Sequence, residues 1–236
     1  MVNKKSIMVT VIALAMVLVF VGCSKKAEAQ SNSGDSGSAG GSARTAELPS
    51  TPESDFTVVL TQDSAGVIIN KYNGTAAVVN IPSTIQGLPV RELNNSSFIN
   101  NRTITSIVIS EGVTRLGTQT FSSCINLTSV TLPSTLTSIG ISSFQGTGLT
   151  SFPNSWPVGI TTIERSTFEN TNLRELVIPE GITTINVFAF GNCNDLVSVT
   201  LPSTIISISD SAFQGSRNIN LASQAAIKAI NLNARF

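Results

Sequence analysis

The chain has 236 residues, of which 12% are charged, 41% are hydrophobic and only 6% are aromatic. Its 14 basic residues balance its 14 acidic residues, so no basic excess points to nucleic acid as a partner. Histidine is absent, which excludes His-containing metal sites, Ser–His and Cys–His nucleophile pairs, and the commonest general base. Ser, Thr, Asn and aliphatic residues dominate, a composition that favours short strands and turns over long helices.

The first 22 residues have the features of an export signal. Two lysines precede the apolar run of residues 7–22, which is short for a spanning helix of roughly 20 apolar residues. The motif F-V-G-C at residues 20–23 resembles a bacterial lipobox, although Phe20 stands where Leu is usual. The resemblance implies cleavage before Cys23 and acylation of Cys23, which would hold the chain to a membrane. An uncut membrane anchor and plain secretion are the alternatives.

A tether and a small cap are predicted between the signal and the rest of the chain. Residues 23–53 begin with Cys23 and are then rich in Ser, Gly and Ala, with too few apolar residues to fold. Such a tether has a mean reach on the order of 30 Å. Residues 54–77 are assigned to an N-terminal cap. Within them, residues 55–70 alternate like one or two strands joined at residues 63–66.

Six phenylalanines recur at spacings of 23, 23, 24, 22 and 23 residues and define an internal repeat. Aliphatic residues stand eight and five positions before each of them and five or six positions after. An alternating L-x-x-V-x-L segment follows, as expected of a half-buried strand, and in three repeats a proline ends it. Each coil can bury its apolar face only against its neighbours. The pattern therefore predicts a mainly β solenoid of about six 23-residue coils. The six phenylalanines are Phe98, Phe121, Phe144, Phe168, Phe190 and Phe213.

The repeat resembles the BspA-type leucine-rich repeat of bacterial surface proteins. The shared pattern is I-P-x-x-[IL]-x-x-I-x-x-x-x-F-x-x-C-x-x-L-x-x-V-x-L-P, and it covers residues 78–221. The resemblance implies a leucine-rich-repeat solenoid, in a family implicated in adhesion to host matrix proteins and to other bacteria. Two departures stand out. The Asn ladder of the commonest leucine-rich repeats is missing, and only Cys124 and Cys193 fill the Cys column after Phe.

The C-terminal residues 222–236 are predicted to form a second cap, with a short helix over residues 223–230 that begins at Ser223 as its N-cap. Cys124 and Cys193 lie three repeats apart. At about 4.8 Å per coil they are expected roughly 14 Å apart, beyond the ~7 Å that a disulfide allows between Cα atoms. We therefore expect both to be small buried residues of the repeat.

No arrangement with catalytic or cofactor chemistry stands out. The neighbours Glu164 and Glu169, and likewise Glu175 and Glu180, have the residue type of a glycosidase pair. Their repeat positions face solvent, which favours a solvated surface instead. Residues 146–151 match only part of a G-x-G-x-x-G motif and lead into a strand rather than out of one. We predict no catalytic residue, no metal site and no cofactor.

The outward positions of the repeated strand form two columns of small, nearly uncharged side chains, either a plain solvent face or a protein-binding face. The first column holds Ser106, Ser129, Ser151, Glu175 and Ser198, and the second holds Val108, Thr131, Pro153, Val177 and Thr200.

Trp156, the only tryptophan, lies in a repeat with two extra residues. On a proline-flanked bulge it would be a candidate interface anchor. Counting back from Ile160, however, places Trp156 in the core column of Leu132 and Ile178, and we favour this buried position.

These observations predict a non-enzymatic, exported lipoprotein at the cell surface or outer membrane. Its expected partners are proteins, not nucleic acid, and its contact with the membrane is the lipid anchor on Cys23. The first expectation is an adhesin for host matrix or other bacteria. A periplasm-facing scaffold or assembly lipoprotein is the alternative, and an enzyme is the remote one.

Overall fold

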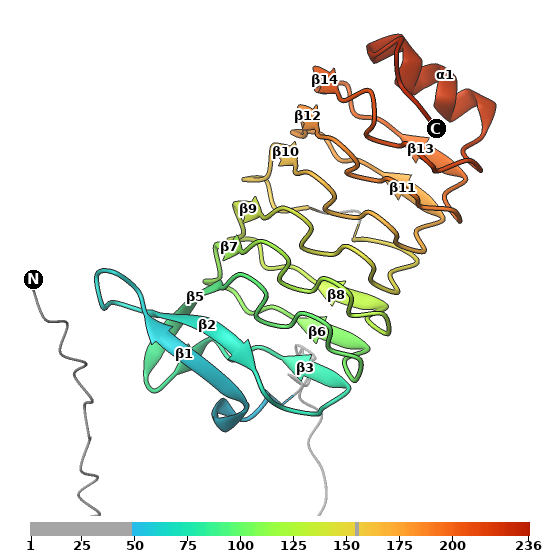
Figure 1. Cartoon of the computed structure of the whole chain (residues 1–236). Coiled ribbons are helices and arrows are strands. Elements are labelled where there is room, and N and C mark those ends of the chain that lie inside the picture. The colour runs from blue at the N-terminus through green and yellow to red at the C-terminus, as the bar shows by residue number, and fades with distance from the viewer. Residues whose placement is uncertain (1–48, 154–155) are drawn as a thin grey trace, which may run out of the picture. The chain divides into compact units, whose positions relative to one another are not determined.

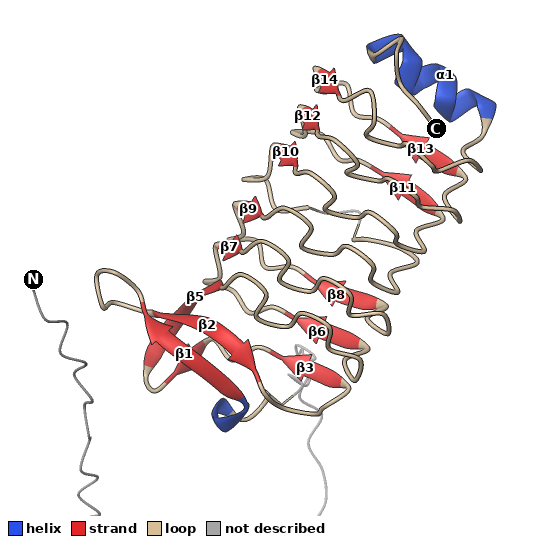
Figure 2. Ribbon diagram, viewed as in Figure 1, coloured by secondary structure: helices blue, strands red, loops and turns tan. Residues whose placement is uncertain are grey.

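The computed structural model of the chain describes residues 49–153 and 156–236 (Figure 1). The predicted export signal, Cys23 and the tether as far as residue 48 lie outside these residues. The described chain forms a solenoid of about six coils of ~23 residues, built mainly from strands, with one short α-helix at its C-terminal end (Figure 2). The predicted fold class is confirmed. We number the coils one to six by their phenylalanines, from Phe98 to Phe213.

An antiparallel hairpin forms the N-terminal cap. A 3-10 helix, Glu53–Asp55, leads into β1 (Phe56–Leu60), which pairs with β2 (Val67–Tyr72). Strand β2 then pairs in parallel with β5 (Leu88–Leu93), so the hairpin continues a sheet of the solenoid. The alternation of residues 55–70 predicted these strands, and the structure confirms them.

The end of the predicted tether belongs to the folded part, which corrects the boundary at residue 53. Thr51 is buried, and its backbone N–H donates to the carbonyl of Asn80 at 2.9 Å. The N–H of Asn80 donates back to the hydroxyl of Thr51 at 2.9 Å, and that of Gln86 donates to the carboxylate of Glu53 at 2.9 Å. The segment thus covers the outer edge of the first strand of the array, which would otherwise expose unpaired backbone groups.

Each regular coil contributes one three-residue strand to a first parallel ladder. Its strands are β3 (Val78–Asn80), β6 (Ser106–Val108), β8 (Ser129–Thr131), β11 (Glu175–Val177) and β13 (Ser198–Thr200). Equivalent residues pair in register, for example Ser106 with Ser129 and Glu175 with Ser198. The middle residue of every strand is buried and its two neighbours face outward.

A second parallel ladder runs along another side of the coils. It continues from β5 through β7 (Arg115–Leu116) and β9 (Ser138–Ile139), and resumes with β10 (Thr162–Ile163), β12 (Thr184–Ile185) and β14 (Ser207–Ile208). The short strand β4 (Thr84–Ile85) pairs antiparallel with β5.

Eight aromatic rings stack through the interior, with centroids 5.1–5.6 Å apart. Six of them are the repeated phenylalanines, and the cap adds Phe56 and Tyr72. Offset or tilted pairs at this distance contribute beyond the apolar area that they bury. The stack therefore joins the cap to the array through one continuous core.

The turns that carry the six phenylalanines form a third ladder. Ser142 and Gly146, two residues before and after Phe144, have φ angles of 54° and 66°. The N–H groups of these three residues donate to carbonyls of the next coil at 2.8–3.0 Å. In the whole array nine non-glycine residues adopt this left-handed conformation beside a repeat phenylalanine. The alternation directs every second N–H along the solenoid axis.

The C-terminal cap is helix α1 (Leu221–Ile230), which buries Ser223 and Ile227 and contacts β13 and β14. The helix begins two residues earlier than predicted. Its N-cap is Asn220, whose side-chain oxygen accepts from the N–H of Ser223 at 2.9 Å. Ser223 is not the cap, because its hydroxyl accepts from the N–H of Val199 at 3.0 Å instead.

Both strand ladders are interrupted at coil four (Figure 2). Residues 149–153 form no strand, so the first ladder splits into β3-β6-β8 and β11-β13, and the second splits between β9 and β10. In coil four Ile160 follows Leu149 by eleven positions, whereas the equivalent residues of the other coils are nine positions apart. Pro153 also lacks the N–H that a ladder residue must donate.

Candidate binding surface

Eight of the ten predicted face residues lie on the first ladder, with their side chains outward on β6, β8, β11 and β13. Ser151 and Pro153 occupy the equivalent positions of coil four but belong to no strand. The predicted columns therefore form two ordered blocks with a gap between them. The exposed members are Ser129, Thr131, Ser151, Glu175, Val177 and Thr200, and the half-buried members are Ser106, Val108, Pro153 and Ser198.

The face is almost free of charge. Glu175 is the one ionisable side chain among the ten residues, and Val177, two residues along the same strand, is 46% exposed. Small hydroxyl and aliphatic side chains keep the surface even. Such a face can recognise a partner by shape and short-range contacts, and it gives little long-range electrostatic attraction.

A depression of about 320 Å³ opens on this face at the gap. Its walls are Thr128, Ser129 and Val130 of coil three and Ser151, Phe152 and Pro153 of coil four. The two extra residues of coil four indicated an irregular coil, but no feature of the sequence predicted a hollow beside it.

Trp156 lies in the core, with 8% of its surface exposed. Its ring is 5.0 Å from that of Phe152 and 5.8 Å from that of Phe168, centroid to centroid. Phe152 in turn packs edge-on against Phe144 and Phe168. The favoured prediction of a buried Trp156 is confirmed, and its alternative role as an exposed interface anchor is wrong, because the ring packs inside the widened coil against Phe152 and Phe168.

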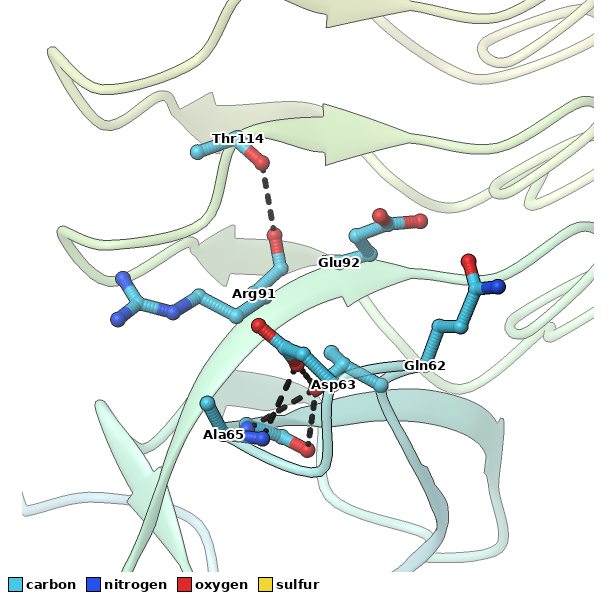
Figure 3. A pocket seen from close by; sticks show the side chains of 8 residues that line it. Gln62, Asp63, Ala65, Arg91, Glu92 and Thr114 are labelled. Carbon is cyan, nitrogen blue, oxygen red and sulfur yellow. Dashed lines mark hydrogen bonds between the residues drawn. The ribbon is translucent and has the colours of Figure 1, made fainter.

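A second hollow, of about 530 Å³, lies under the loop of the N-terminal hairpin (Figure 3). The carboxylate of Asp63 points back into its own turn, where it accepts from the hydroxyl of Thr61 at 2.6 Å and the N–H of Ala65 at 3.0 Å. These two hydrogen bonds lower the pKa of Asp63. On the opposite wall, Glu92 is paired with Arg115 at 2.9 Å. The acidic groups are therefore engaged within the fold. No repeat position signals this hollow, so the sequence did not reveal it.

Three of the four acidic residues considered for glycosidase chemistry hold neighbouring coils together, and the fourth, Glu175, is exposed on the first ladder. The carboxylate of Glu164 accepts from Asn186 at 3.1 Å, and that of Glu169 accepts from Gln145 at 2.9 Å. Glu180 accepts from both the N–H and the hydroxyl of Ser203, at 2.9 and 3.0 Å. These bonds give the side chains structural roles between coils.

Glu111 repeats the arrangement of Glu180 three coils away. Its carboxylate accepts from the N–H and the hydroxyl of Ser134 at 2.8 and 2.9 Å. In both places the next residue is a glycine at a φ near +97°, and its N–H donates to the threonine that follows the serine. Coils two and three, and coils five and six, are thus joined by the same clip of four residues. In both carboxyls the hydrogen bonds from serine lower the pKa.

Cys124 and Cys193 are free and buried. Each thiol donates to the carbonyl of a phenylalanine in the preceding coil, Phe98 or Phe168, at 3.1 Å. Burial raises the pKa of the Cys124 thiol to about 11 and also raises that of Cys193. The thiolate that nucleophilic or metal chemistry needs is therefore disfavoured at both positions.

Among residues 49–153 and 156–236, no three His, Cys, Asp or Glu side chains gather as metal ligands would. The helix in that part of the chain lacks the length and apolar character needed to cross a membrane.

The three ladders and the stacked rings define a leucine-rich-repeat solenoid, a class whose domains generally serve as protein-interaction scaffolds. A family model described as the BspA type leucine-rich repeat region matches residues 91–220 in 6 copies. The match covers more than half of the chain, which therefore belongs to the BspA-type leucine-rich-repeat family. Among curated proteins nothing matches.

Solved bacterial structures share the fold. A leucine-rich repeat protein of T. pallidum is 22% identical with a TM-score of 0.64, and the alignment covers 80% of this chain and 100% of that one. One from Bacteroides ovatus is 26% identical with a TM-score of 0.63, over 70% of this chain and 44% of that one. A leucine rich cell surface protein of Faecalibacterium prausnitzii is 23% identical with a TM-score of 0.59, over 73% and 54%. The chain thus spans about half the length of the latter two.

Proposed function

We propose that the chain is an exported lipoprotein that binds protein partners through the outward face of its first strand ladder. The observation that carries the proposal is this face. It is even, nearly uncharged and exposed across two blocks of in-register strands, and it continues from coil to coil. Repeated in-register strands of this kind create the extended binding surfaces of solenoid proteins.

Adhesion is the finer part of the proposal, with host matrix proteins or other bacteria as the partners. The family membership and the name of the F. prausnitzii structure, a cell surface protein, support a position outside the cytoplasm. The neutral face supports a broad contact of many small interactions over several coils. Affinity is then expected to change little with salt, because few charges meet across the contact.

The test is binding of the full chain to immobilised matrix proteins, fibronectin first, with a bulky charge placed on each side of the same coil. Ser129→Arg puts the charge on the proposed face, and Ser138→Arg, on the outward side of β9, is the matched control. Both serines are exposed, so both variants should keep their melting temperature. We expect Ser129→Arg to weaken binding about tenfold or more and Ser138→Arg to leave it unchanged. Equal effects of the two changes would contradict the assignment of the face.

The lipid anchor on Cys23 supplies the attachment in this proposal. One acyl chain gives only marginal membrane binding, with an association constant on the order of 10⁴ M⁻¹, and stable anchoring needs a second. A diacylglyceryl-modified cysteine meets that need. Growth with labelled palmitate should therefore mark the wild-type chain and leave Cys23→Ala unmarked. An unmarked wild-type chain would refute lipidation.

A periplasm-facing scaffold or assembly lipoprotein is the competing outcome of the same experiments. A surface adhesin is cut when intact cells are treated with protease, whereas a periplasmic scaffold is protected until the outer membrane is opened. Protection on intact cells, together with no binding to any host component, would replace the adhesin by the scaffold.

A further inference from the structure

One edge of strand β8 faces coil four without a partner strand. On its other edge β8 pairs with β6, where Ser129 donates to the carbonyl of Thr105 at 3.2 Å and Thr131 accepts from Ile109 at 3.0 Å. In a parallel ladder the intervening residues direct their backbone groups to the opposite side. The carbonyls of Thr128 and Val130 and the N–H groups of Val130 and Leu132 therefore point toward coil four.

Within the described part of the chain, these four groups find no backbone partner in coil four. The regular coils differ. Ile109 and Ile178 are the counterparts of Leu132 in coils two and five, and the N–H of each donates to a carbonyl of the next coil at 3.0 Å. Pro153 explains part of the loss, because it stands where coil four should offer an N–H to Val130. A strand edge of this kind is a ready template for another strand.

The depression of about 320 Å³ lies beside this edge, and its walls include Thr128 and Val130. The second ladder is open at the same boundary, between β9 and β10. On the ring side, coils three and four stay joined through three backbone hydrogen bonds of 2.8–3.0 Å and the stacked rings of Phe144 and Phe168. Among residues 49–153 and 156–236, the two coils are thus hydrogen-bonded through the backbone on the ring side but are not paired as strands in either ladder.

We propose that this open edge receives an extended peptide segment of the protein partner, which adds to β8 as a short parallel strand. The inference rests on the proposed function and names how the partner is held. Main-chain hydrogen bonds to these four groups, which have no backbone partner in coil four among residues 49–153 and 156–236, give the affinity, as in other cases of strand addition. Three residues at about 3.3 Å each match the length of β8. The walls of the depression carry no charge, so an uncharged segment rich in Val, Thr or Ser fits.

We call the space between the open edge of β8 and coil four the slot. The experiment uses the full chain and a capped peptide with the sequence of residues 196–201, L-V-S-V-T-L. This segment includes β13, which pairs with β11 in the register that the slot requires. Binding is followed by isothermal titration and by the amide NMR signals of Val130 and Leu132. The control peptide is N-methylated at the backbone nitrogens of its single Ser and its single Thr. These are the residues whose N–H groups would donate to β8. We expect the unmodified peptide to bind at the two amides named. Losing two main-chain hydrogen bonds should weaken it about tenfold or more.

A variant of the chain closes the slot. Pro153→Thr combined with deletion of residues 154 and 155 restores the nine-residue interval and the missing N–H of coil four. We expect it to lose peptide binding about tenfold or more while its melting temperature stays the same or rises. Pro179→Thr exchanges a proline that follows strand β11 in coil five and is not at a ladder position, so this control should bind normally.

The peptide arm tests the slot even where a variant fails to fold. No binding to the wild-type chain, equal binding of the methylated peptide, or equal loss in Pro179→Thr would overturn the inference. A dimer of the wild-type chain that vanishes when the slot is closed would overturn it too, because the occupant would be a second copy. If the peptide does not bind but Ser129→Arg still weakens binding to matrix proteins, the slot is wrong and the proposed binding face is retained. If the peptide does not bind and Ser129→Arg has no effect, the proposed function is contradicted as well.

Discussion

At the scale of single residues, the repeated phenylalanines are the main fastening of one coil to the next. Phe144 is fully buried between the rings of Phe121 and Phe168, at 5.4 and 5.6 Å, and Phe152 closes its edge. Truncating such a ring removes apolar burial and leaves a cavity that its stacked neighbours cannot fill.

Phe144→Ala should therefore lower the free energy of unfolding by about 3–5 kcal/mol. Ser129→Ala, on the exposed face of the same coil, should change it by less than about 0.5 kcal/mol. Urea unfolding curves of the two variants check this difference. Small and equal losses would mean that the ring column is not the core.

The left-handed residues beside each ring make a second prediction. Asn170 is exposed, has a φ of 57° and follows Phe168 by two residues. Asn170→Val places a β-branched side chain in that conformation and should cost about 1–2 kcal/mol, while Asn170→Gly should be neutral or stabilising. Asn172→Val, at an exposed neighbour outside the left-handed region, is the matched control in the same thermal melts. A similar loss in both valine variants would point to something other than backbone strain.

The pH dependence of the inter-coil clip follows from the lowered pKa of Glu111. Hydrogen bonds from Ser134 favour its carboxylate and hold its pKa below the usual 4.5. Its contribution to stability is therefore complete above pH 4.5 and is lost as the pH falls through the lower, folded-state pKa. Ser134→Ala should raise the pKa of Glu111 toward 4.5, as a carboxyl NMR titration would show. Ser203→Ala should do the same to Glu180 and leave Glu111 unchanged, since that clip lies in other coils.

At the scale of elements, helix α1 depends on its cap. The side chain of Asn220 satisfies the N–H of Ser223, one of the donors that the first helical turn leaves free. Asn220→Ala should destabilise the chain by about 0.5–2 kcal/mol, and Asn220→Asp should not. Loss of amide protection confined to residues 221–230, measured by hydrogen exchange, would locate the effect. Protection that is unchanged in the alanine variant would contradict the role of the cap.

The elements also show what the sequence alone could predict. The strands and the ring column follow from the 23-residue period, because stacked coils force equivalent residues into the same environment. The rings of Phe56 and Tyr72 escaped notice because they join the stack from outside that period. Asn220 was missed because Ser223 is an equally good cap by residue type. Thr51 was missed because a buried threonine in a polar segment carries no apolar signal.

The face was predicted as two unbroken columns, and its gap was not. Predicting the gap required knowing that the backbone nitrogen at position 153 faces coil three, where Pro153 has no N–H to donate. That orientation depends on ladder geometry and not on side-chain type. The hydrogen-bonded clips of Glu, Gly, Ser and Thr could not be predicted either, although Glu-Gly and Pro-Ser-Thr alternate in the printed sequence. Only the stacking order brings each glutamate against the serine of the following coil.

At the scale of the whole molecule, the interrupted ladders divide the array into two blocks. Stability in such stacks is roughly a sum of coil and interface contributions, so a weak interface limits how far a disturbance spreads. Phe121→Ala should reduce hydrogen-exchange protection in coils one to three and spare coils five and six. Phe190→Ala should do the reverse. Mass spectrometry of exchanged peptides from the two variants would decide the point, and uniform loss across the array in either variant would show that coil four transmits the disturbance.

The left-handed residues beside the rings also bear on how the chain acquires its structure during synthesis. Each non-glycine residue in this conformation costs about 1–2 kcal/mol, and the N–H group of each such residue beside a ring donates to a carbonyl of the following coil. A newly made coil therefore gains little by folding until its successor has emerged. At least one repeat of the nascent chain therefore remains unfolded after it leaves the ribosome. On the proposed export route, that delay would keep the polypeptide threadable through a translocation channel until it reaches the compartment where it works.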